Sequence, residues 1–108
     1  MYYSFLNAFS LNMVKCRETQ VSITEISLAE VIDILRNNNC KSYVGHQDLC
    51  NILNDMLNFT VAFNRENFYF SEECDKAIVA QYSGNRLPEG TTTLPEDSEI
   101  RFFTVKVK

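Results

Sequence analysis

The sequence lacks the residues from which metal centres, disulfide frameworks and membrane anchors are usually built. Its 108 residues include one histidine, no tryptophan, three glycines and two prolines. Four cysteines are present, but their spacing contains no C-x-x-C pair, so neither a zinc cluster nor a disulfide framework is indicated. No stretch approaches the ~20 consecutive apolar residues of a membrane span. We expect no metal or other cofactor, and reduced, mostly buried thiols.

Positive charge is also scarce. Ten basic and fourteen acidic side chains give a net charge of -4, and no Lys/Arg cluster of the kind that grips long nucleic acid is present. A small anion held by a few placed groups remains compatible with this composition. The apolar N-terminus, MYYSFLNAFSLNMV, lacks the basic start of a secretion signal. We therefore expect it to belong to the folded part of a soluble, cytoplasmic protein.

The length limits how large a site one copy can enclose. A chain of 108 residues fits a single domain, here residues 1–108. A pocket for a nucleotide-sized ligand would take a large share of so small a volume, so a large site forms more easily between two copies. A homodimer is the expected arrangement.

Two amphipathic helices are predicted in the first half of the chain. The first begins after Ser27, which forms a capping box with Glu30, and it ends at the three asparagines of residues 37–39. The second begins at or just after His46. Its apolar positions recur at i, i+3, i+4, i+7 and i+8: Leu49, Ile52, Leu53, Met56 and Leu57.

Strand patterns flank these helices and dominate the second half. The predicted strands are 2–6, a half-buried strand at 21–24, a hairpin of 61–63 and 67–70 around 64–66, 77–82, and a strand with one wet face at 100–108. Gly and Pro predict a long loop over 84–99. The order of elements predicts an α/β fold, in which one small domain has a mixed β-sheet flanked by helices on at least one side.

Gly45 and His46 stand at the start of the second predicted helix. Free backbone N–H groups and the helix dipole at such a position favour an anion such as phosphate. Histidine titrates near neutral pH and can donate a proton to the leaving oxygen of a phosphate ester. A lone histidine near a helix start is nevertheless often incidental, and residue type alone leaves both interpretations open.

Two further segments carry groups that recognise nucleotides. The loop R-L-P-E-G places Arg86 and Glu89 together, and a guanidinium matches two phosphate oxygens while a carboxylate can fix a ribose or the arginine. In the N-terminal loop, Asn7, Ser10 and Asn12 offer uncharged donors and acceptors among apolar neighbours. Either segment is equally compatible with an ordinary solvated turn.

Taken together, these motifs resemble one family. FLNAFSLNM, YVGHQD before an amphipathic helix, QYSGNRLPEG and IRFFTVKV resemble, in the same order, the type III anti-CRISPR ring nucleases of archaeal and bacterial viruses, a family also found in bacterial genomes and mobile elements. The similarity spans essentially the whole chain. It implies a homodimer that binds cyclic tetra-adenylate, the second messenger of type III CRISPR complexes, across the subunit interface and cleaves it without a metal.

The resemblance also assigns roles to individual residues. His46, Arg86 and Glu89 match the catalytic positions, with His46 as the general acid for in-line attack by a 2′-hydroxyl. The residues that match ligand-binding positions are Asn7, Ser10, Asn12, Gly45, Arg65 and Gln81, the last if the following loop carries one extra residue. One departure is the segment 91–99, which is shorter here than in the viral members, where a helix precedes the last strand.

Two other functions remain open at this point. A non-catalytic protein that sequesters a cyclic nucleotide would need the ligand-binding residues without His46. A dimeric interaction protein would use the same loops to contact another protein, and nucleotides would not stabilise it.

Overall fold

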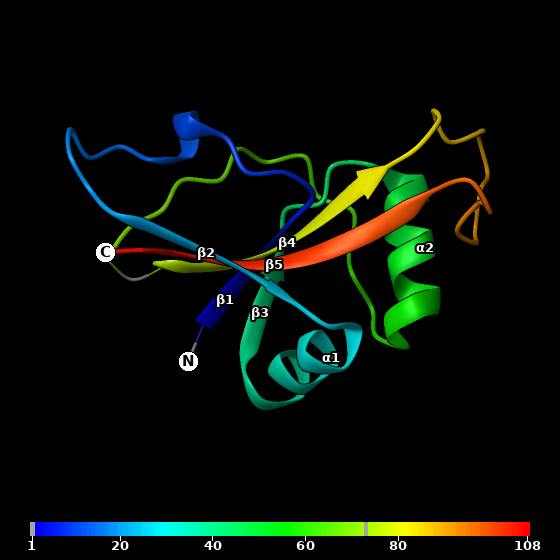
Figure 1. Cartoon of the computed structure of the whole chain (residues 1–108), viewed down its shortest axis with the longest axis horizontal. Coiled ribbons are helices and arrows are strands. Elements are labelled where there is room, and N and C mark those ends of the chain that lie inside the picture. The colour runs from blue at the N-terminus through cyan, green and yellow to red at the C-terminus, as the bar shows by residue number, and fades with distance from the viewer. Residues whose placement is uncertain (1, 73) are drawn as a thin grey trace.

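The computed structural model describes residues 2–72 and 74–108 and contains a five-stranded sheet (Figure 1). The strand order is β2-β5-β4-β1-β3. β1 runs parallel to β3 and β4, whereas β5 is antiparallel to β4 and β2, so the sheet is mixed, as predicted. The strands are β1 (Tyr2–Leu6), β2 (Val21–Ile26), β3 (Asn39–Ser42), β4 (Lys76–Ser83) and β5 (Glu99–Val107).

Both predicted helices are present, and both pack on the same face of the sheet. α1 (Leu28–Asn37) begins with the complete capping box of Ser27 and Glu30 and ends at the asparagine run. α2 (Gln47–Leu57) follows His46 as its N-cap residue. The main core joins the buried side of each helix to one face of β1, β4 and β5: Val31 and Leu35 of α1, Leu49, Leu53 and Leu57 of α2, and Tyr3, Phe5, Ile78, Ala80 and Phe102 of the sheet.

Coil covers the opposite face of the sheet. One piece is the N-terminal segment with a short 3-10 helix, η1 (Leu11–Met13), and the other is the segment 61–72, which Figure 1 shows in blue and yellow-green across the sheet from α1. A second buried cluster forms beneath them from Leu6, Phe68, Phe70, Ala77, Val79 and Val105. The sheet is therefore an internal layer, which gives its central strands two apolar faces.

The hairpin predicted for residues 61–70 is wrong. This segment forms no strand pair, and its one ladder contact is an isolated parallel bridge between Phe63 and Val44. Asn64 does not turn the chain back on itself, because its side chain donates to the Ser42 carbonyl oxygen at 2.9 Å. The period-two aromatics Phe68 and Phe70 instead bury their rings in the second cluster. Alternation in an extended segment that packs on a sheet looks the same in sequence as alternation within a sheet.

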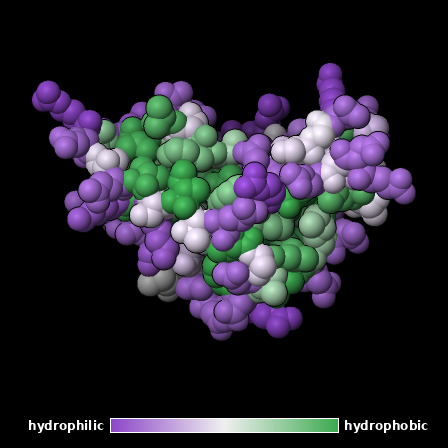
Figure 2. Space-filling model, in the orientation of Figure 1, coloured by the Kyte–Doolittle hydropathy of each residue, from purple (hydrophilic) through white to green (hydrophobic). Residues whose placement is uncertain are grey.

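The two antiparallel strands differ in how far the predicted patterns hold. In β5 the alternation predicted from Phe103 onward is present, with Val105 buried and Lys106 exposed, while Phe102 adds a contact to the helix-side core. In β2 the half-buried pattern fails at Ile23, which is 57% exposed on this edge strand, whereas Val21 packs against the second cluster. On the face of the molecule that Figure 2 displays, hydrophobic residues are visible at the surface among hydrophilic ones.

The four cysteines are free, as expected, but only Cys50 is fully buried. Cys16 is exposed, and Cys40 and Cys74 are half-buried. Burial, reinforced by the nearby Cys74 thiol, raises the pKa of Cys40 to about 11. Within residues 2–72 and 74–108 no helix is long and apolar enough to cross a membrane, and no three His, Cys, Asp or Glu side chains gather as metal ligands would.

These environments predict one fast-reacting thiol. A pKa of about 11 in place of the ordinary 9.0 leaves Cys40 roughly a hundredfold less thiolate at pH 8, and Cys50 is inaccessible. Cys74 is half-buried, and its Sγ is hydrogen-bonded to the Ser4 hydroxyl at 2.9 Å. Titration of the native protein with a thiol reagent should show a single rapid phase from Cys16. A Cys16→Ser variant should lose that phase, and its persistence in the variant would contradict the assignment.

Candidate functional site

Two open cavities are lined by adjacent residues where the chain passes from β3 to α2. The larger, of about 590 Å³, is called the N-terminal pocket, and the smaller, of about 460 Å³, the histidine pocket. Gly45 lines the first and its neighbour His46 the second. The N-terminal pocket contains five of the six predicted ligand-binding residues: Asn7, Ser10, Asn12, Gly45 and Arg65. The histidine pocket contains all three predicted catalytic residues, together with Asp48, Leu87 and Pro88.

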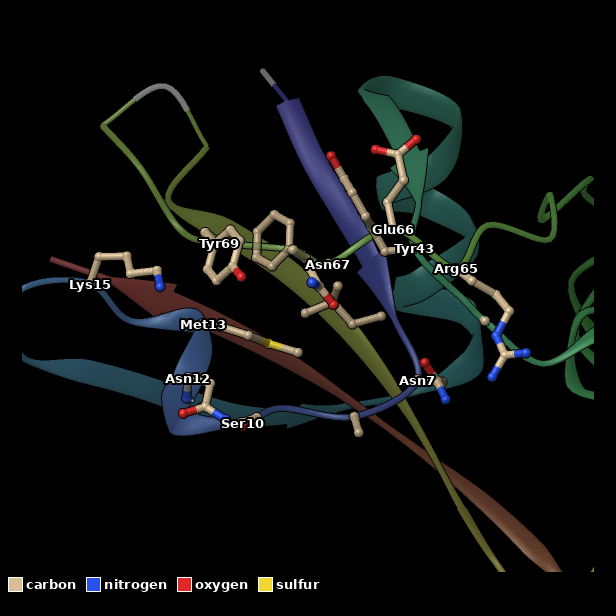
Figure 3. A pocket seen from close by; sticks show the side chains of 14 residues that line it. Asn7, Ser10, Asn12, Met13, Lys15, Tyr43, Arg65, Glu66, Asn67 and Tyr69 are labelled. Atoms are coloured by element: carbon tan, nitrogen blue, oxygen red, sulfur yellow. Dashed lines mark hydrogen bonds between the residues drawn. The ribbon is translucent and has the colours of Figure 1, made fainter.

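The N-terminal loop forms one side of the N-terminal pocket. It follows β1, which ends at Leu6, and then crosses the face of the sheet. Ser10 caps η1, and its hydroxyl accepts a hydrogen bond from the Asn12 N–H at 3.2 Å. Figure 3 shows Asn7 and Arg65 at one end of the pocket and Lys15 and Tyr69 at the other. The predicted amide and hydroxyl groups therefore line one continuous cavity with two cations.

Gly45 lies on the other side of this pocket, where the backbone of residues 64 and 65 approaches it closely. A Cβ at Gly45 would lie 3.3 Å from Cγ of Arg65 and 3.6 Å from the Asn64 carbonyl oxygen. Asn64 holds this arrangement, since its N–H donates to the Val44 carbonyl oxygen at 2.9 Å in addition to its side-chain bond to Ser42. The absence of a side chain at Gly45 thus lets the Arg65 side chain pack closely against this part of the pocket wall.

Sequence reasoning missed several residues of the N-terminal pocket. Lys15 Nζ lies 4.1 Å from the ring centroid of Tyr69, a cation–π contact on an exposed ring. Tyr43 packs against Phe68 with ring centroids 5.0 Å apart. Asn67 adds a further amide. Asn67 and Tyr69 lie in the segment whose alternation predicts a hairpin, and that pattern gives no sign that they line a pocket beside the predicted Arg65.

The His46 side chain is held in place because it caps the N-terminus of α2. Its Nδ1 accepts a hydrogen bond from the Leu49 N–H at 3.3 Å, the bond that a serine or asparagine N-cap usually makes. In the neutral ring the proton is therefore assigned to Nε2. The imidazole is exposed at the histidine pocket, so Nε2 is the nitrogen free to donate to a bound group.

The loop 84–98 carries Arg86 and Glu89 to the histidine pocket. Pro88 to Thr91 form a turn in which the Thr91 N–H donates to the Pro88 carbonyl oxygen at 3.2 Å. Gly90 has φ of 83°, the value that the third residue of a type II turn requires. This turn sets Glu89 at the cavity and directs the Gly90 N–H to the Asp48 carboxylate, 3.2 Å away.

Gln81 lies apart from the other predicted site residues. It is exposed on β4, its Nε2 donates to the Tyr82 carbonyl oxygen at 3.3 Å, and it lines neither pocket. Its cross-strand partner is Arg101, which makes two hydrogen bonds, of 2.8 and 3.1 Å, to Glu25. Those bonds lower the pKa of Glu25 below its ordinary value. Alternation along β4 places Gln81 on the same sheet face as Val79, the face that holds the N-terminal pocket.

Fold and pockets together define a class: a small α/β domain with helices on one face of a mixed sheet and a polar cleft on the other. The chain belongs to the STIV B116-like family, whose model matches residues 3–106. Among solved structures it is similar to B116 of Sulfolobus turreted icosahedral virus, with a TM-score of 0.78 and 25% sequence identity. The match covers 96% of this chain and 98% of that chain. A comparison with curated proteins found no match.

The cap bond makes the stability contribution of His46 separable from its chemistry. His46→Ala removes the acceptor for the Leu49 N–H and should lower the free energy of unfolding by ~1 kcal/mol. His46→Asn supplies an amide oxygen to the same N–H and should unfold close to the parent protein. Urea denaturation of the three proteins checks this, and equal stabilities for the alanine and asparagine variants would contradict a capping role.

Proposed function

We propose that this chain is a metal-independent ring nuclease that binds cyclic tetra-adenylate as a homodimer and cleaves it, antagonising or resetting type III CRISPR signalling. The observation that carries the proposal is the lining of the histidine pocket. His46 comes from the start of α2, whereas Arg86 and Glu89 come from a loop forty residues further along, and the three line one cavity. Gly45, the residue before His46, lines the other cavity together with four more of the residues expected to bind the ligand.

The chemistry follows from the arrangement of RNA itself. Each adenosine's 2′-hydroxyl stands beside its own 3′-phosphate, so the site need only hold the attacking oxygen, the phosphorus and the 5′-oxygen in line. The 2′-oxygen–phosphorus bond forms as the phosphorus–5′-oxygen bond breaks, which leaves a 2′,3′-cyclic phosphate. His46 donates its proton to the departing 5′-oxygen, and the 2′-hydroxyl proton passes to a carboxylate or water base, for which Glu89 is one candidate in this pocket.

Arg86 supplies the charge that this step needs. Its guanidinium can match two oxygens of the phosphate on which negative charge develops. The site otherwise contains two carboxylates, Asp48 and Glu89, so Arg86 and a protonated His46 are the groups that offset them. In the N-terminal pocket, Lys15 and Arg65 can contact the remaining phosphates.

Proton donation and helix capping compete for His46. The imidazolium form carries a proton on Nδ1 and cannot accept the Leu49 N–H, so charging the ring releases one cap bond, worth ~1 kcal/mol. A phosphate beside the ring can offset that loss through a charge-assisted hydrogen bond from Nε2. Substrate binding and acid formation are therefore coupled at this residue.

The size of the pockets favours a second copy. The N-terminal pocket, at about 590 Å³, falls within the ~300–1,000 Å³ of pockets that hold drug-sized ligands. A cyclic tetranucleotide is larger, and two pockets related by a two-fold axis would divide it between them. Apolar side chains remain exposed on the single chain, including Leu11 at 80% and Ile23 at 57%. Their burial in a dimer would be favourable.

The direct test is cleavage of purified cyclic tetra-adenylate with and without EDTA, resolved by liquid chromatography. We expect linear di-adenylates with a cyclic or open phosphate, formed equally with EDTA. His46→Asn should lower the rate ~10²- to 10⁴-fold while leaving ligand binding and stability near those of the parent, because the amide caps α2 but donates no comparable proton.

Two other outcomes would replace the proposal. Ligand that stays intact but raises the melting temperature would identify a sequestering protein. The absence of both cleavage and stabilisation would favour an interaction protein. Sedimentation velocity on the same samples should show a dimer, and a monomer that nonetheless cleaves would remove the shared-pocket argument.

A further inference from the structure

We propose that Asp48 is a positioning residue that holds the loop bearing Arg86 and Glu89 against the start of α2. The assignment deepens the function proposed above and rests on it for the catalytic consequence, whereas the structural consequence stands by itself. Asp48 was not singled out by its residue type or by any motif. It is identified by a hydrogen bond that spans forty-two positions of the chain, from the Gly90 N–H to its Oδ1.

The base of the loop is closed independently of Asp48. β4 and β5 remain paired up to Ser83 and Glu99. A Cβ on Gly84, whose φ is 153°, would lie 2.6 Å from Cβ of Ser98, so the two ends of the loop touch where only glycine fits. The Tyr82 hydroxyl donates to the Asn85 carbonyl oxygen at 2.6 Å and makes this end more rigid.

The tip of the loop has far less to hold it. In the described part of the chain, the bond from Gly90 to Asp48 is the one hydrogen bond between residues 84–98 and α2. Arg86, Glu89 and Gly90 are exposed, and Leu87 is half-buried. The position of the tip relative to α2 therefore depends largely on this one polar contact.

Asp48 is well placed for this task because it belongs to the same helical turn as His46. It is the second residue of α2, two positions after the cap, and its carboxylate is favoured there by the helix dipole. One rigid turn thus sets both the imidazole and the anchor of the opposing loop. Displacement of catalytic groups by about 1 Å can cost ~100-fold in rate, so loss of the anchor should reach the chemistry.

The negative charge of Asp48 opposes the binding of an anionic ligand, whereas its hydrogen bond to Gly90 holds the loop in place. A second carboxylate beside Glu89 disfavours a phosphate in the same cavity. An asparagine retains an oxygen acceptor for the Gly90 N–H but removes the charge. Asp48→Asn and Asp48→Ala consequently separate the two effects, and Asp55→Ala, an exposed carboxylate further along α2, is the matched control.

The first measurement needs no substrate. Hydrogen–deuterium exchange of the free protein should show faster exchange over residues 84–92 in Asp48→Ala, and parent-like exchange in Asp48→Asn and Asp55→Ala. Unchanged exchange in Asp48→Ala would overturn the proposal. Faster exchange throughout the chain would overturn it as well, since Asp48 would then support the fold rather than the loop.

The second measurement is single-turnover cleavage of cyclic tetra-adenylate. Asp48→Ala should slow the chemical step ~10- to 100-fold with ligand affinity changed little. Asp48→Asn should retain the rate and bind the anionic ligand at least as tightly. Equal rate loss in both variants would show that the charge matters rather than the anchor. A parent protein that fails to cleave would end the proposed function, while the exchange result would still decide whether Asp48 holds the loop.

Discussion

The passage from β3 into α2 is the constraint on which both pockets depend. The Tyr43 N–H still donates to β1, at the Phe5 carbonyl oxygen 2.8 Å away, and three residues later His46 already caps the helix. Gly45, in between, leaves room for the 64–65 backbone. A chain that must change from strand to helix so abruptly exposes backbone donors and one side chain at the sheet end, where ligands commonly bind in α/β proteins.

Local signals were strong enough to predict most of the scaffold. The capping box at Ser27 and the apolar stripe of α2 each depend on neighbours within one helical turn, so the sequence specifies them without tertiary information. The segment 61–70 could not be assigned in this way. Whether an alternating stretch pairs with a strand or packs across a sheet depends on distant residues, here on the Asn64 contact to Ser42.

The residues of the candidate site also fall into two groups: those that a short motif identifies and those that only contacts with distant residues identify. Residues within short motifs, such as Arg86 and Glu89, could be singled out from the sequence, and they line one cavity with His46. Asp48 and Lys15 could not, because their importance comes from contacts to Gly90 and Tyr69 that lie far away in the chain. Gln81 shares a sheet face with the N-terminal pocket but does not line it.

Local charge in this protein departs from its overall charge. The chain is acidic, with a net charge of -4, yet Lys15 and Arg65 line the same cavity and Arg86 lines the neighbouring one. Few positive charges at fixed positions discriminate by geometry, whereas a broadly basic surface attracts any polyanion. Lys15, Arg65 and Arg86 thus place positive charge at two cavities of a chain that is acidic as a whole.

The contact between Gly84 and Ser98 also has a meaning for how such proteins diversify. Because the two ends of the loop meet there, the residues between them can change in number without disturbing the register of β4 and β5. Doubling the length of a flexible loop costs only ~0.6 kcal/mol in closure entropy. Segments of different length between Gly84 and Ser98 would therefore be compatible with the same pairing of β4 and β5.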